Sequence, residues 1–425
     1  MEKIKSVRAR KIKLNPSKVW RERLKKWMGT SRWIYNRCLD FYNKKKCKLS
    51  RKDFRSKIVG GWNHGEPKKK GKKDKKRGKN RGKWFYVKKN KRECKTSWVL
   101  ETPFEIRDSA MVDLCRAFER NFEKREKNPN HQFTIKFRSK KDVQVLKIPG
   151  KCIKNGLMFT RSCGKEGLEG FEDWSSYNGE IVVQMDRIGD FYMCVTEQSE
   201  IIPKPVPNPN DLRVAALDPG VRTFNTCVDS KGVVTEFAPG DIGRIYRLCH
   251  HMDKIQSKAF DKSIKSKKRY RLRKAWHRAI KKVKDLVMDV RNKTVKFLCQ
   301  NYDVVFLPDF NTKNMVNRAG RRICKNTARG MMTWSHYTFK ELLKTTALRE
   351  GTRVVIVTEE YTSKTCSCCG TQHPNLGSSK VFRCPSLSCQ RVMDRDENGA
   401  RNILLKSCME NGLTFEWVDN ISSNM

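Results

Sequence analysis

The sequence predicts an α/β and β multidomain protein whose C-terminal domain has a ribonuclease H-like fold. The proline-rich segment from Pro203 to Asn210 indicates a stiff linker and the clearest domain boundary. Before it, short strand-like runs punctuated by glycine favour a small barrel or sandwich. After it, three adjacent strand-like runs precede helices that alternate with two further strands, which is the element order of a ribonuclease H-like fold.

The N-terminal part combines amphipathic helices with short strands. Asn15, Pro16 and Ser17 form a helix start signal, and apolar residues at helical spacing follow as far as Gly29, where the helix should break. Further helices are expected over 31–44 and 109–126. Strands are expected over 6–14, 133–137, 143–148, 157–160, 181–185 and 191–196.

The C-terminal part follows the ribonuclease H-like order. Strands are expected over 213–218, 224–229 and 233–237, with a hairpin turn at 230–232, and then over 302–307 and 352–358. A long and very basic helical region covers 241–301, a further helix covers 333–350, and the last helix begins near Asp396.

The charge of the chain predicts a polyanionic partner. The 93 lysine and arginine residues against 45 acidic residues give a formal net charge of +48. A compact protein with this excess repels itself unless a polyanion neutralises it, and nucleic acid is the expected polyanion. No apolar run is long enough to span a bilayer, so a membrane partner is not expected. The lysine-rich segment 67–95 cannot form a core and indicates a basic insertion, or a nuclear-import signal.

The cysteines predict a metal site rather than disulfides. The chain has 17 cysteines, an odd number, and its charged start carries no secretory signal, so a reducing compartment is favoured. Cys366, Cys369, Cys384 and Cys389 form a C-x2-C and a C-x4-C pair across a short loop. Four thiolates suit one structural zinc ion and leave no open position for catalysis, with Cys368 as a competing ligand.

Two carboxylates lie where a metal ion could be held. Asp218 closes an apolar strand and precedes Pro219, and its alternative interpretation is an ordinary turn. An unpaired buried charge is expensive, whereas Mg²⁺ needs hard oxygen ligands on a rigid element. Asp396 lies at the start of the last helix, where Gly399 would let the helix approach the sheet, and Asp394 could serve simply as a helix cap.

A third carboxylate is required if the chain cuts phosphodiesters by the two-metal route, which uses ions about 4 Å apart. Asp309 follows the strand 302–307, and Glu359 and Glu360 follow the strand 352–358. All three are candidates at this point.

Several motifs resemble TnpB, the transposon-encoded RNA-guided nuclease related to type V CRISPR effectors. They are the run from Glu360 to Cys366, the second thiol pair, and the run from Asp394 to Ile403. The run 217–220 resembles the first RuvC motif of TnpB, and the runs 29–36 and 311–315 resemble two further segments. The resemblance covers most of the chain apart from the lysine-rich insertion.

One departure points to a branch of this family. TnpB carries its catalytic glutamate directly after the fourth strand, where this chain has Pro308. In this respect the chain resembles Fanzor, the eukaryotic and giant-virus relative, whose glutamate lies on the strand before the zinc knuckle. The resemblance implies Glu359 as the third ligand. Glu360 is the rival candidate. Because adjacent residues on a strand face opposite sides, only one of the two glutamates can reach the metal ions. Asp309 is the third candidate. The C-x4-C spacing is also wider than the family's usual C-x2-C, which makes Cys389 the least typical thiol ligand.

The resemblance implies a domain organisation. A wedge β-barrel domain would comprise residues 1–15 and 131–202, with a helical recognition domain over 16–130 between them. A RuvC nuclease domain would comprise residues 211–425, with a zinc knuckle over 362–392 inserted in it.

The resemblance also implies an RNA-guided DNA endonuclease. Asp218, Glu359 and Asp396 would hold two Mg²⁺ ions, and a structured guide RNA encoded beside the gene would direct cleavage of double-stranded DNA next to a short target-adjacent motif. The protein would be a monomer in its RNA complex. The long basic helix would line a channel for the heteroduplex backbone, while Trp276, Ile280, Val283 and Val287 pack on the sheet. The candidate channel residues are Arg269, Arg271, Arg273, Lys274, Arg278, Lys281, Lys282 and Lys284.

Two other functions fit the same residues. One is a catalytically silent RNA-guided DNA-binding protein, in which Pro308 would mark a lost acidic residue. The other is an unguided transposase or resolvase-like nuclease that binds DNA without RNA. The position of the glutamate favours a eukaryotic or viral source. We therefore expect a nuclear location, or for a virus the host nucleus or the viral factory, and not secretion.

Overall fold

The computed structural model describes residues 4–44, 49–60, 97–154, 157–159, 163, 179–201, 211–317, 321, 323–377 and 379–412. The chain divides into two compact units, one over Val7–Ser199 and one over Met1–Ser6 with Glu200–Met425. The predicted linker over 203–210 and the lysine-rich insertion over 67–95 lie outside the described residues.

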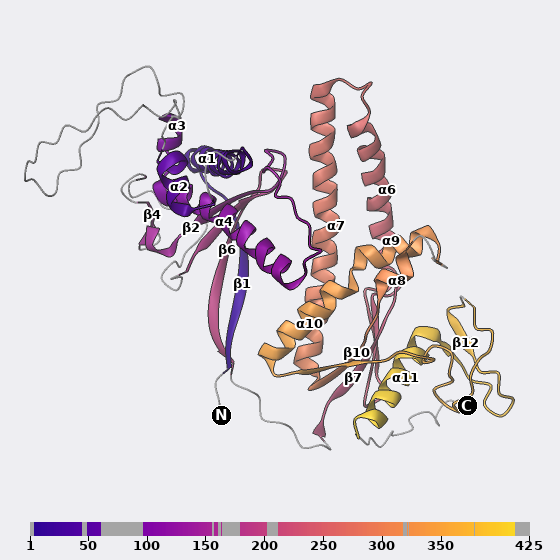
Figure 1. Cartoon of the computed structure of the whole chain (residues 1–425). Coiled ribbons are helices and arrows are strands. Elements are labelled where there is room, and N and C mark those ends of the chain that lie inside the picture. The colour runs from indigo at the N-terminus through magenta and orange to yellow at the C-terminus, as the bar shows by residue number, and fades with distance from the viewer. Residues whose placement is uncertain are drawn as a thin grey trace, which may run out of the picture. The chain divides into compact units, whose positions relative to one another are not determined.

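The first unit contains a four-stranded sheet in the order β1–β6–β5–β2 (Figure 1). Its strands are β1 (Ile4–Leu14), β2 (Gln144–Ile148), β5 (Ile181–Met185) and β6 (Phe191–Ile201). The pairs β2–β5 and β5–β6 are antiparallel, and β3 (Ile153–Lys154) and β4 (Leu157–Met158) form a separate small hairpin. The strands predicted over 143–148, 181–185 and 191–196 are confirmed, whereas closure of the sheet into a wedge barrel stays a prediction.

A single long helix, α1 (Lys18–Asn43), replaces the two helices that the sequence predicts. Ser17 caps it by accepting a hydrogen bond from the backbone N–H of Trp20 at 3.3 Å, as the start signal indicates. The predicted break at Gly29 is wrong. A glycine costs a helix about 1 kcal/mol relative to alanine, and the burial of Trp27, Met28 and Ile34 on the same helix outweighs that cost.

The second long helix of this unit is α4 (Phe104–Lys127), where the sequence predicts a helix over 109–126. Short helical turns precede it at α2 (Arg51–Phe54), at a π-helical turn over Arg55–Val59 and at α3 (Ser97–Leu100). The strand predicted over 133–137 is wrong, because these residues form no ladder with another strand. The extended segment is instead held by Asn36 of α1, whose side chain exchanges hydrogen bonds with both backbone groups of Arg138 at 2.9 and 2.7 Å.

The second unit is built around a five-stranded sheet in the order β11–β10–β7–β8–β9. Its strands are β7 (Val214–Pro219), β8 (Asn225–Asp229), β9 (Val234–Phe237), β10 (Val304–Pro308) and β11 (Arg353–Val357). The first three are antiparallel neighbours, and β10 and β11 run parallel to β7 on its other side. This is the strand order that the sequence predicts.

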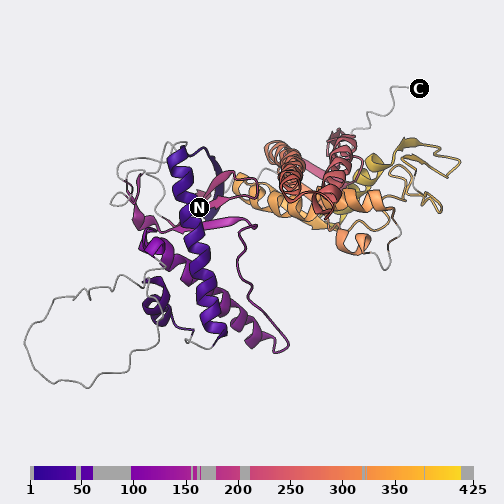
Figure 2. The same ribbon diagram turned by 90° about the horizontal axis from the view of Figure 1, so that it is seen from above.

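Helices cover this sheet, and two of them form a long hairpin. They are α6 (Asp241–Phe260), α7 (Ser266–Asn301), α8 (Thr312–Val316), α9 (Lys325–Trp334), α10 (His336–Glu350) and α11 (Arg395–Glu410). Figures 1 and 2 show α6 and α7 side by side, with the loop that joins them far from the sheet. The predicted helix over 333–350 is divided, because Ser335 adopts a left-handed conformation with φ 50° between α9 and α10.

Neighbouring residues of the central strands face opposite layers of helices. Val214 and Ala216 of β7 pack with α11, in an apolar cluster that includes Ala400, Ile403 and Leu404. Ala215 and Leu217 pack on the other side with residues of α6, α7, α9 and α10. This alternation decides which carboxylates at the strand ends can meet.

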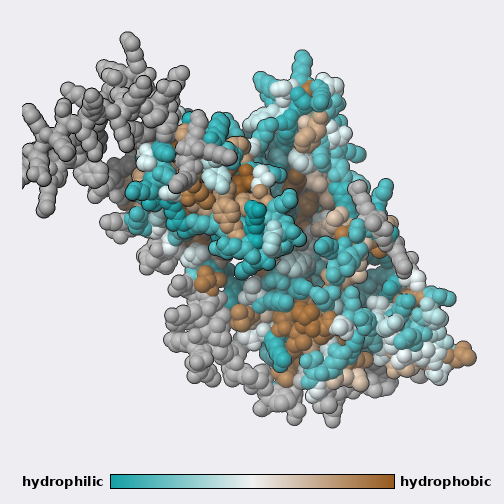
Figure 3. All heavy atoms as spheres, viewed as in Figure 1, coloured by the Kyte–Doolittle hydropathy of each residue, from teal (hydrophilic) through white to brown (hydrophobic). Residues whose placement is uncertain are grey.

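The surface of α6 and α7 is largely hydrophilic on the face that Figure 3 shows. Val283 and Val287 of α7 are buried in the core, as predicted. Trp276 is a correction, because it packs edge-to-face on Phe260 of α6 at 5.6 Å and not on the sheet. The first half of α7 extends beyond the sheet, so its apolar stripe packs on α6 (Figure 1). Within the described residues no helix has the length and apolar character to cross a membrane.

Candidate metal centres

Asp218 lies at the end of the central strand β7. Its backbone pairs with that of Thr226 in β8, and the four residues before it are fully buried. By the alternation of β7, its side chain follows Val214 and Ala216 toward the α11 face. The carboxylate is therefore held by a rigid element in the middle of the sheet, as the sequence predicts.

Glu359 reaches the same face from β11. Val357 belongs to the apolar cluster beside α11, and Glu359 follows it by two residues. The side chain of Glu359 is partly buried, whereas that of Glu360 is exposed. Because β7, β10 and β11 run parallel, their carboxyl ends meet at one edge, which brings Glu359 toward Asp218.

Asp396 comes from the first turn of α11. Asp394 caps this helix by accepting hydrogen bonds from the backbone N–H groups of Asp396 and Glu397 at 2.8 and 3.4 Å, so its capping role is confirmed. Gly399 lies against the strand end, because a Cβ placed there would lie 2.5 Å from Oδ2 of Asp218. Glycine at this position therefore lets the helix backbone approach the carboxylate.

Asp218 is the carboxyl group on which the charges of the other two act. Burial raises the pKa of Asp218 well above its usual range, and the negative charges of Asp396 and Glu359 raise it further. Burial also raises the pKa of Glu359 and of Asp396. Three carboxyl groups that resist ionisation together are a donor set that a cation would stabilise.

Asp309 belongs to the opposite face. It follows Leu307 of β10, which packs in the cluster with α10, and its carboxylate pairs with Lys340 of α10 at 2.7 Å. Hydrogen bonding to Lys340 lowers the pKa of Asp309, whose side chain is 64% exposed. The geometry thus separates Asp309 from the carboxylates that face α11, although its charge still contributes to the raised pKa of Glu359.

The second centre is the cluster of Cys366, Cys369, Cys384 and Cys389. Their sulfur atoms all lie within 4.8 Å of one another. The hairpin of β12 (Val381–Arg383) and β13 (Val392–Asp394) carries the second pair, and Gly370, with φ +75°, makes the turn after the first pair. The buried ring of Phe382 lies in a small apolar core beneath the cluster.

The spacing of the sulfur atoms fits one tetrahedral zinc ion. Four Zn–S bonds of about 2.3 Å place the sulfurs about 3.8 Å apart. The separations here are 3.9 Å for Cys366 and Cys389 and 3.5 Å for Cys369 and Cys384. The competing ligand Cys368 is exposed and outside the cluster, while Cys389 lies within it despite the unusual spacing. These four thiols can therefore hold zinc.

Comparison with known proteins shows which families the chain resembles. Three family models match it: "Helix-turn-helix domain" over residues 6–45, "Probable transposase" over 192–319, and "Cas12f1-like, TNB domain" over 336–403. A candidate transposase, A625R of Paramecium bursaria Chlorella virus 1, is 28% identical over 94% of this chain and 87% of its own length. Over most of its length the chain is similar to proteins of the TnpB/IS605 transposase family.

Further relatives include proteins of a giant virus and of a bacterium. The TnpB-like protein L79 of Acanthamoeba polyphaga mimivirus is 31% identical over 44% of this chain and 36% of its own length. A candidate RNA-guided DNA endonuclease, InsQ of Escherichia coli K12, is 23% identical over 76% of this chain and 78% of its own length. The residues matched by the TNB-domain model include Glu359, Asp396 and all four clustered cysteines.

Two asparagines that were not predicted from the sequence connect the helix of Asp396 to the loop that carries the first cysteine pair. Asn402 of α11 donates to the backbone oxygens of Thr362 and Thr365 at 2.8 and 2.6 Å. Asn398, one helical turn earlier, donates to Thr365 and accepts from the backbone N–H of Ser367 at 2.9 Å. The sequence signal that could have identified them is their spacing of four residues on the apolar side of a helix. Buried amide side chains at such positions need hydrogen-bond partners.

The basic residues predicted to line a channel divide into two groups. Arg271, Arg278, Lys282 and Lys284 are exposed on α7. Arg269, Arg273, Lys274 and Lys281 are partly buried, and Arg273 lies over the Phe260 ring of α6 at 5.8 Å. The exposed group is the part of α7 that a phosphate backbone could reach.

Proposed function

We propose that the chain is an RNA-guided DNA endonuclease with a ribonuclease H-like RuvC domain, and that it is a Fanzor-type member of the TnpB/IS605 family. The observation that carries this proposal is that Asp218 lies on the α11 face of the five-stranded sheet, near enough to Glu359 and Asp396 for their charges to raise its pKa. Similarity to relatives that are described as an RNA-guided DNA endonuclease and a CRISPR-associated endodeoxyribonuclease supports the same activity.

In this proposal Asp218, Glu359 and Asp396 hold two Mg²⁺ ions. Their oxygen donors fit that ion, and the close approach of Gly399 keeps the helix-borne and strand-borne carboxylates together. Bound Mg²⁺ would activate a water molecule and stabilise the leaving oxygen of the phosphodiester. The protein's contribution is to fix the three carboxylates on rigid elements before the substrate arrives.

The thiol cluster has a structural role in the proposal. Zinc held by Cys366, Cys369, Cys384 and Cys389 has no open coordination position, so it would not take part in hydrolysis. It would instead stiffen the loop that leads from Glu359 into α11. The hydrogen bonds of Asn398 and Asn402 tie that loop to the helix that carries Asp396.

The partners in the proposal are a guide RNA and a double-stranded DNA target. A formal charge of +48 requires neutralisation by a polyanion, and the exposed cations of α7 offer contacts to a nucleic-acid backbone. The RNA would be transcribed beside the gene, and one protein chain would bind one RNA. Base pairing, and not side chains, would then read the target sequence.

The test is to express the gene with its downstream flanking DNA and to sequence the RNA that purifies with the protein. The proposal expects a discrete RNA that maps to the flank and ends in a variable guide. The complex, given Mg²⁺ and a matching duplex, should cut it, and Asp218→Ala or Asp396→Ala should bind the same RNA without cutting. Recovery of heterogeneous cellular RNA alone would refute guidance.

Two outcomes would identify the alternative functions. A wild-type complex that binds its target but never cuts it, at any Mg²⁺ concentration, would be a silent RNA-guided DNA-binding protein. A protein that cuts DNA equally well after its RNA is digested away would be an unguided transposase-like nuclease. Full activity in Asp396→Ala would remove the metal assignment in either case.

We also propose a nuclear location, or the host nucleus or viral factory for a viral source. The support is the basic sequence of the 67–95 insertion. A fluorescent fusion of the full chain should concentrate in the nucleus of a eukaryotic cell. The same fusion without residues 67–95 should distribute evenly, and unchanged nuclear accumulation would remove the insertion as the import signal.

A further inference from the structure

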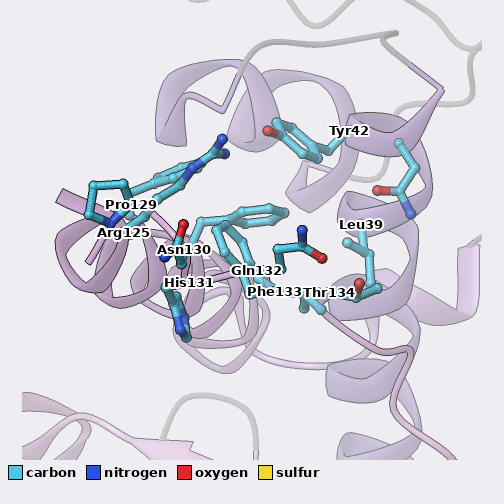
Figure 4. A pocket seen from close by; sticks show the side chains of 13 residues that line it. Leu39, Tyr42, Arg125, Pro129, Asn130, His131, Gln132, Phe133 and Thr134 are labelled. Carbon is cyan, nitrogen blue, oxygen red and sulfur yellow. The ribbon is translucent and has the colours of Figure 1, made fainter. Parts of the chain in front are cut away.

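A cavity of about 760 Å³ opens in the first unit, between α1, α4 and the extended segment that follows α4. None of its lining residues belongs to either metal centre, because all of them lie between 39 and 135. In Figure 4 the side chains of Tyr42 from α1 and Arg125 from α4 reach toward one another across it. The volume is in the range of sites that bind small planar ligands, roughly 300–1,000 Å³.

Aromatic rings form one wall of this cavity. Phe122 stacks on Phe118 with ring centroids 6.0 Å apart and meets Phe133 edge-on at 5.4 Å. His131 stacks on Phe133 at 6.0 Å, and Tyr42 lies 4.5 Å from Phe118. Phe118 is buried in the core, but Phe122 is 37% exposed and offers part of its ring to a ligand.

Polar groups surround the aromatic wall. The amide side chains of Asn43, Asn130 and Gln132 line the cavity and are exposed, and so is the guanidinium of Arg125. Lys124 and Lys127 lie on the same exposed end of α4. An amide offers both a donor and an acceptor, which is what the edge of a nucleobase requires, and the cations suit the adjoining phosphate.

The segment that completes the cavity is fixed in place. At one end Asn36 bonds both backbone groups of Arg138, and the Arg138 guanidinium covers the Tyr35 ring at 3.8 Å. At the other end the His131 ring bonds Oδ1 of Asn121 at 3.2 Å, and its backbone N–H donates to Asn128 at 2.9 Å. The cavity is therefore preformed, and a ligand would not have to order it.

We propose that this cavity binds one unpaired nucleobase of the nucleic acid that the protein carries. The base would stack on Phe122 and present its edge to the amides, with its phosphate near Arg125. The proposal rests on the proposed function for the presence of a bound nucleic acid. It assigns to the first unit a contact with a single extruded nucleotide, in addition to any contact with a duplex backbone.

The first experiment is ultraviolet crosslinking of the purified complex, with and without a matching DNA duplex, followed by mass spectrometry of the joined peptides. The expected result is one nucleotide attached to a peptide within residues 118–135. A ribonucleotide would assign the base to the guide RNA, and a deoxyribonucleotide would assign it to the target. Crosslinks confined to other peptides would overturn the proposal.

The second experiment compares affinities of matched variants for the same strand. Phe122→Ala should weaken binding roughly 5- to 150-fold, the equivalent of the about 1–3 kcal/mol of a base–aromatic stack. Phe122→Tyr keeps an aromatic face and should restore binding. Phe137→Ala changes a phenylalanine outside the cavity that is 54% exposed, more than the 37% of Phe122, and should bind like the wild type. Arg125→Ala should weaken binding, whereas Arg120→Ala, its control on the same helix, should bind like the wild type.

An abasic nucleotide at the crosslinked position isolates the contact. It should weaken wild-type binding as much as Phe122→Ala does, and the two changes together should cost no more than either alone. Additive losses, or equal affinity of Phe122→Ala and Phe137→Ala, would overturn the proposal. A wild type that still carries its RNA and cuts DNA in that case keeps the proposed function, so the two failures are distinguishable.

Discussion

At the scale of single residues, strand register separates the candidate carboxylates. Asp218 and Glu359 each come two residues after a side chain that packs on α11, namely Ala216 and Val357. Asp309 comes two residues after Leu307, which packs beside α10. Successive side chains of a strand point to opposite faces, so a shift of one residue moves a carboxylate out of the site. Asp309 accordingly pairs with Lys340 of α10.

Glu359→Ala and Glu360→Ala should therefore differ sharply in DNA cleavage. Loss of a partly buried carboxylate beside Asp218 should lower the cleavage rate by roughly a hundredfold or more, whereas loss of exposed Glu360 should change it little. Single-turnover cleavage of a guided duplex measures the difference, with Asp309→Ala as a second control. Equal rates for the two glutamate variants would place the third ligand elsewhere.

Cys389→Ser and Cys368→Ser should likewise differ in zinc content. The Cys389 sulfur lies 3.9 Å from that of Cys366 within the cluster, whereas Cys368 is exposed outside it. Elemental analysis should find one zinc ion per chain in the wild type and in Cys368→Ser, and much less in Cys389→Ser. Because the metal stabilises the folded knuckle, Cys389→Ser should also unfold at a lower temperature. Zinc loss from both variants would reopen the choice of ligands.

At the scale of elements, the sequence predicts the strands of the five-stranded sheet and the ends of its helices better than it predicts interruptions. Buried strands give continuous apolar runs, which are visible without a structure. The break at Ser335 is not visible, because tertiary hydrogen bonds hold it. Trp334 donates from its ring to Val221, and the His336 ring contacts Gly220, at 3.0 and 3.2 Å. The Gly29 prediction failed for the converse reason, since burial along α1 outweighs a local helix breaker.

Asn402→Ala tests the connection between α11 and the loop after Glu359. The change leaves the carbonyl group of Thr362 without its side-chain donor and the carbonyl group of Thr365 with Asn398 as its remaining side-chain donor, which should cost about 1–3 kcal/mol of the free energy of unfolding. Urea unfolding measures this cost. Asn301→Ala removes a single exposed bond to Phe297 and should change stability by less than about 0.5 kcal/mol. Cleavage should fall in Asn402→Ala alone, and undiminished cleavage would separate the loop from the site.

His336 makes the junction of α9 and α10 sensitive to acid. Burial lowers the pKa of His336 from 6.5 to about 4, so the unfolded chain binds a proton between these values while the folded protein does not. The free energy of unfolding therefore has its full value above pH 6.5. It decreases as the pH falls toward 4, because protonation of this histidine favours the unfolded chain. Between pH 7.5 and pH 5 the loss should be about 2 kcal/mol.

His336→Gln should remove this part of the pH dependence, because glutamine does not titrate. Urea unfolding at pH 7.5 and pH 5 measures it for both proteins. His250→Gln, on the exposed surface of α6, is the matched control and should keep the wild-type dependence. Identical pH dependence in His336→Gln and the wild type would show that another group causes the acid sensitivity.

At the scale of the whole molecule, the sequence predicts the partner through charge and the site through motifs, but it does not predict the support around the site. The composition alone requires a polyanion, and the spacing of the four cysteines alone indicates zinc. Asn398 and Asn402 were missed because their importance lies in backbone groups more than 30 residues away. The cavity beside α4 was missed because residues 133–137, which begin within its lining, were predicted to be a strand and form no ladder in the structure.

The net charge also predicts how nucleic-acid binding responds to salt. Each phosphate contact by a cation contributes about 0.7–0.9 to the slope of log affinity against log salt concentration. Replacing the exposed residues Arg271, Arg278, Lys282 and Lys284 of α7 by alanine should reduce that slope by up to about 3. The slope is measured from binding of the purified RNA between 50 and 400 mM salt, at about four concentrations.

A control with alanine at the exposed residues Lys25, Lys52, Lys140 and Lys141 has the same net charge and should keep more of the slope. Equal slopes in the two variants would mean that α7 contributes only to the general field of the protein and not to a binding channel.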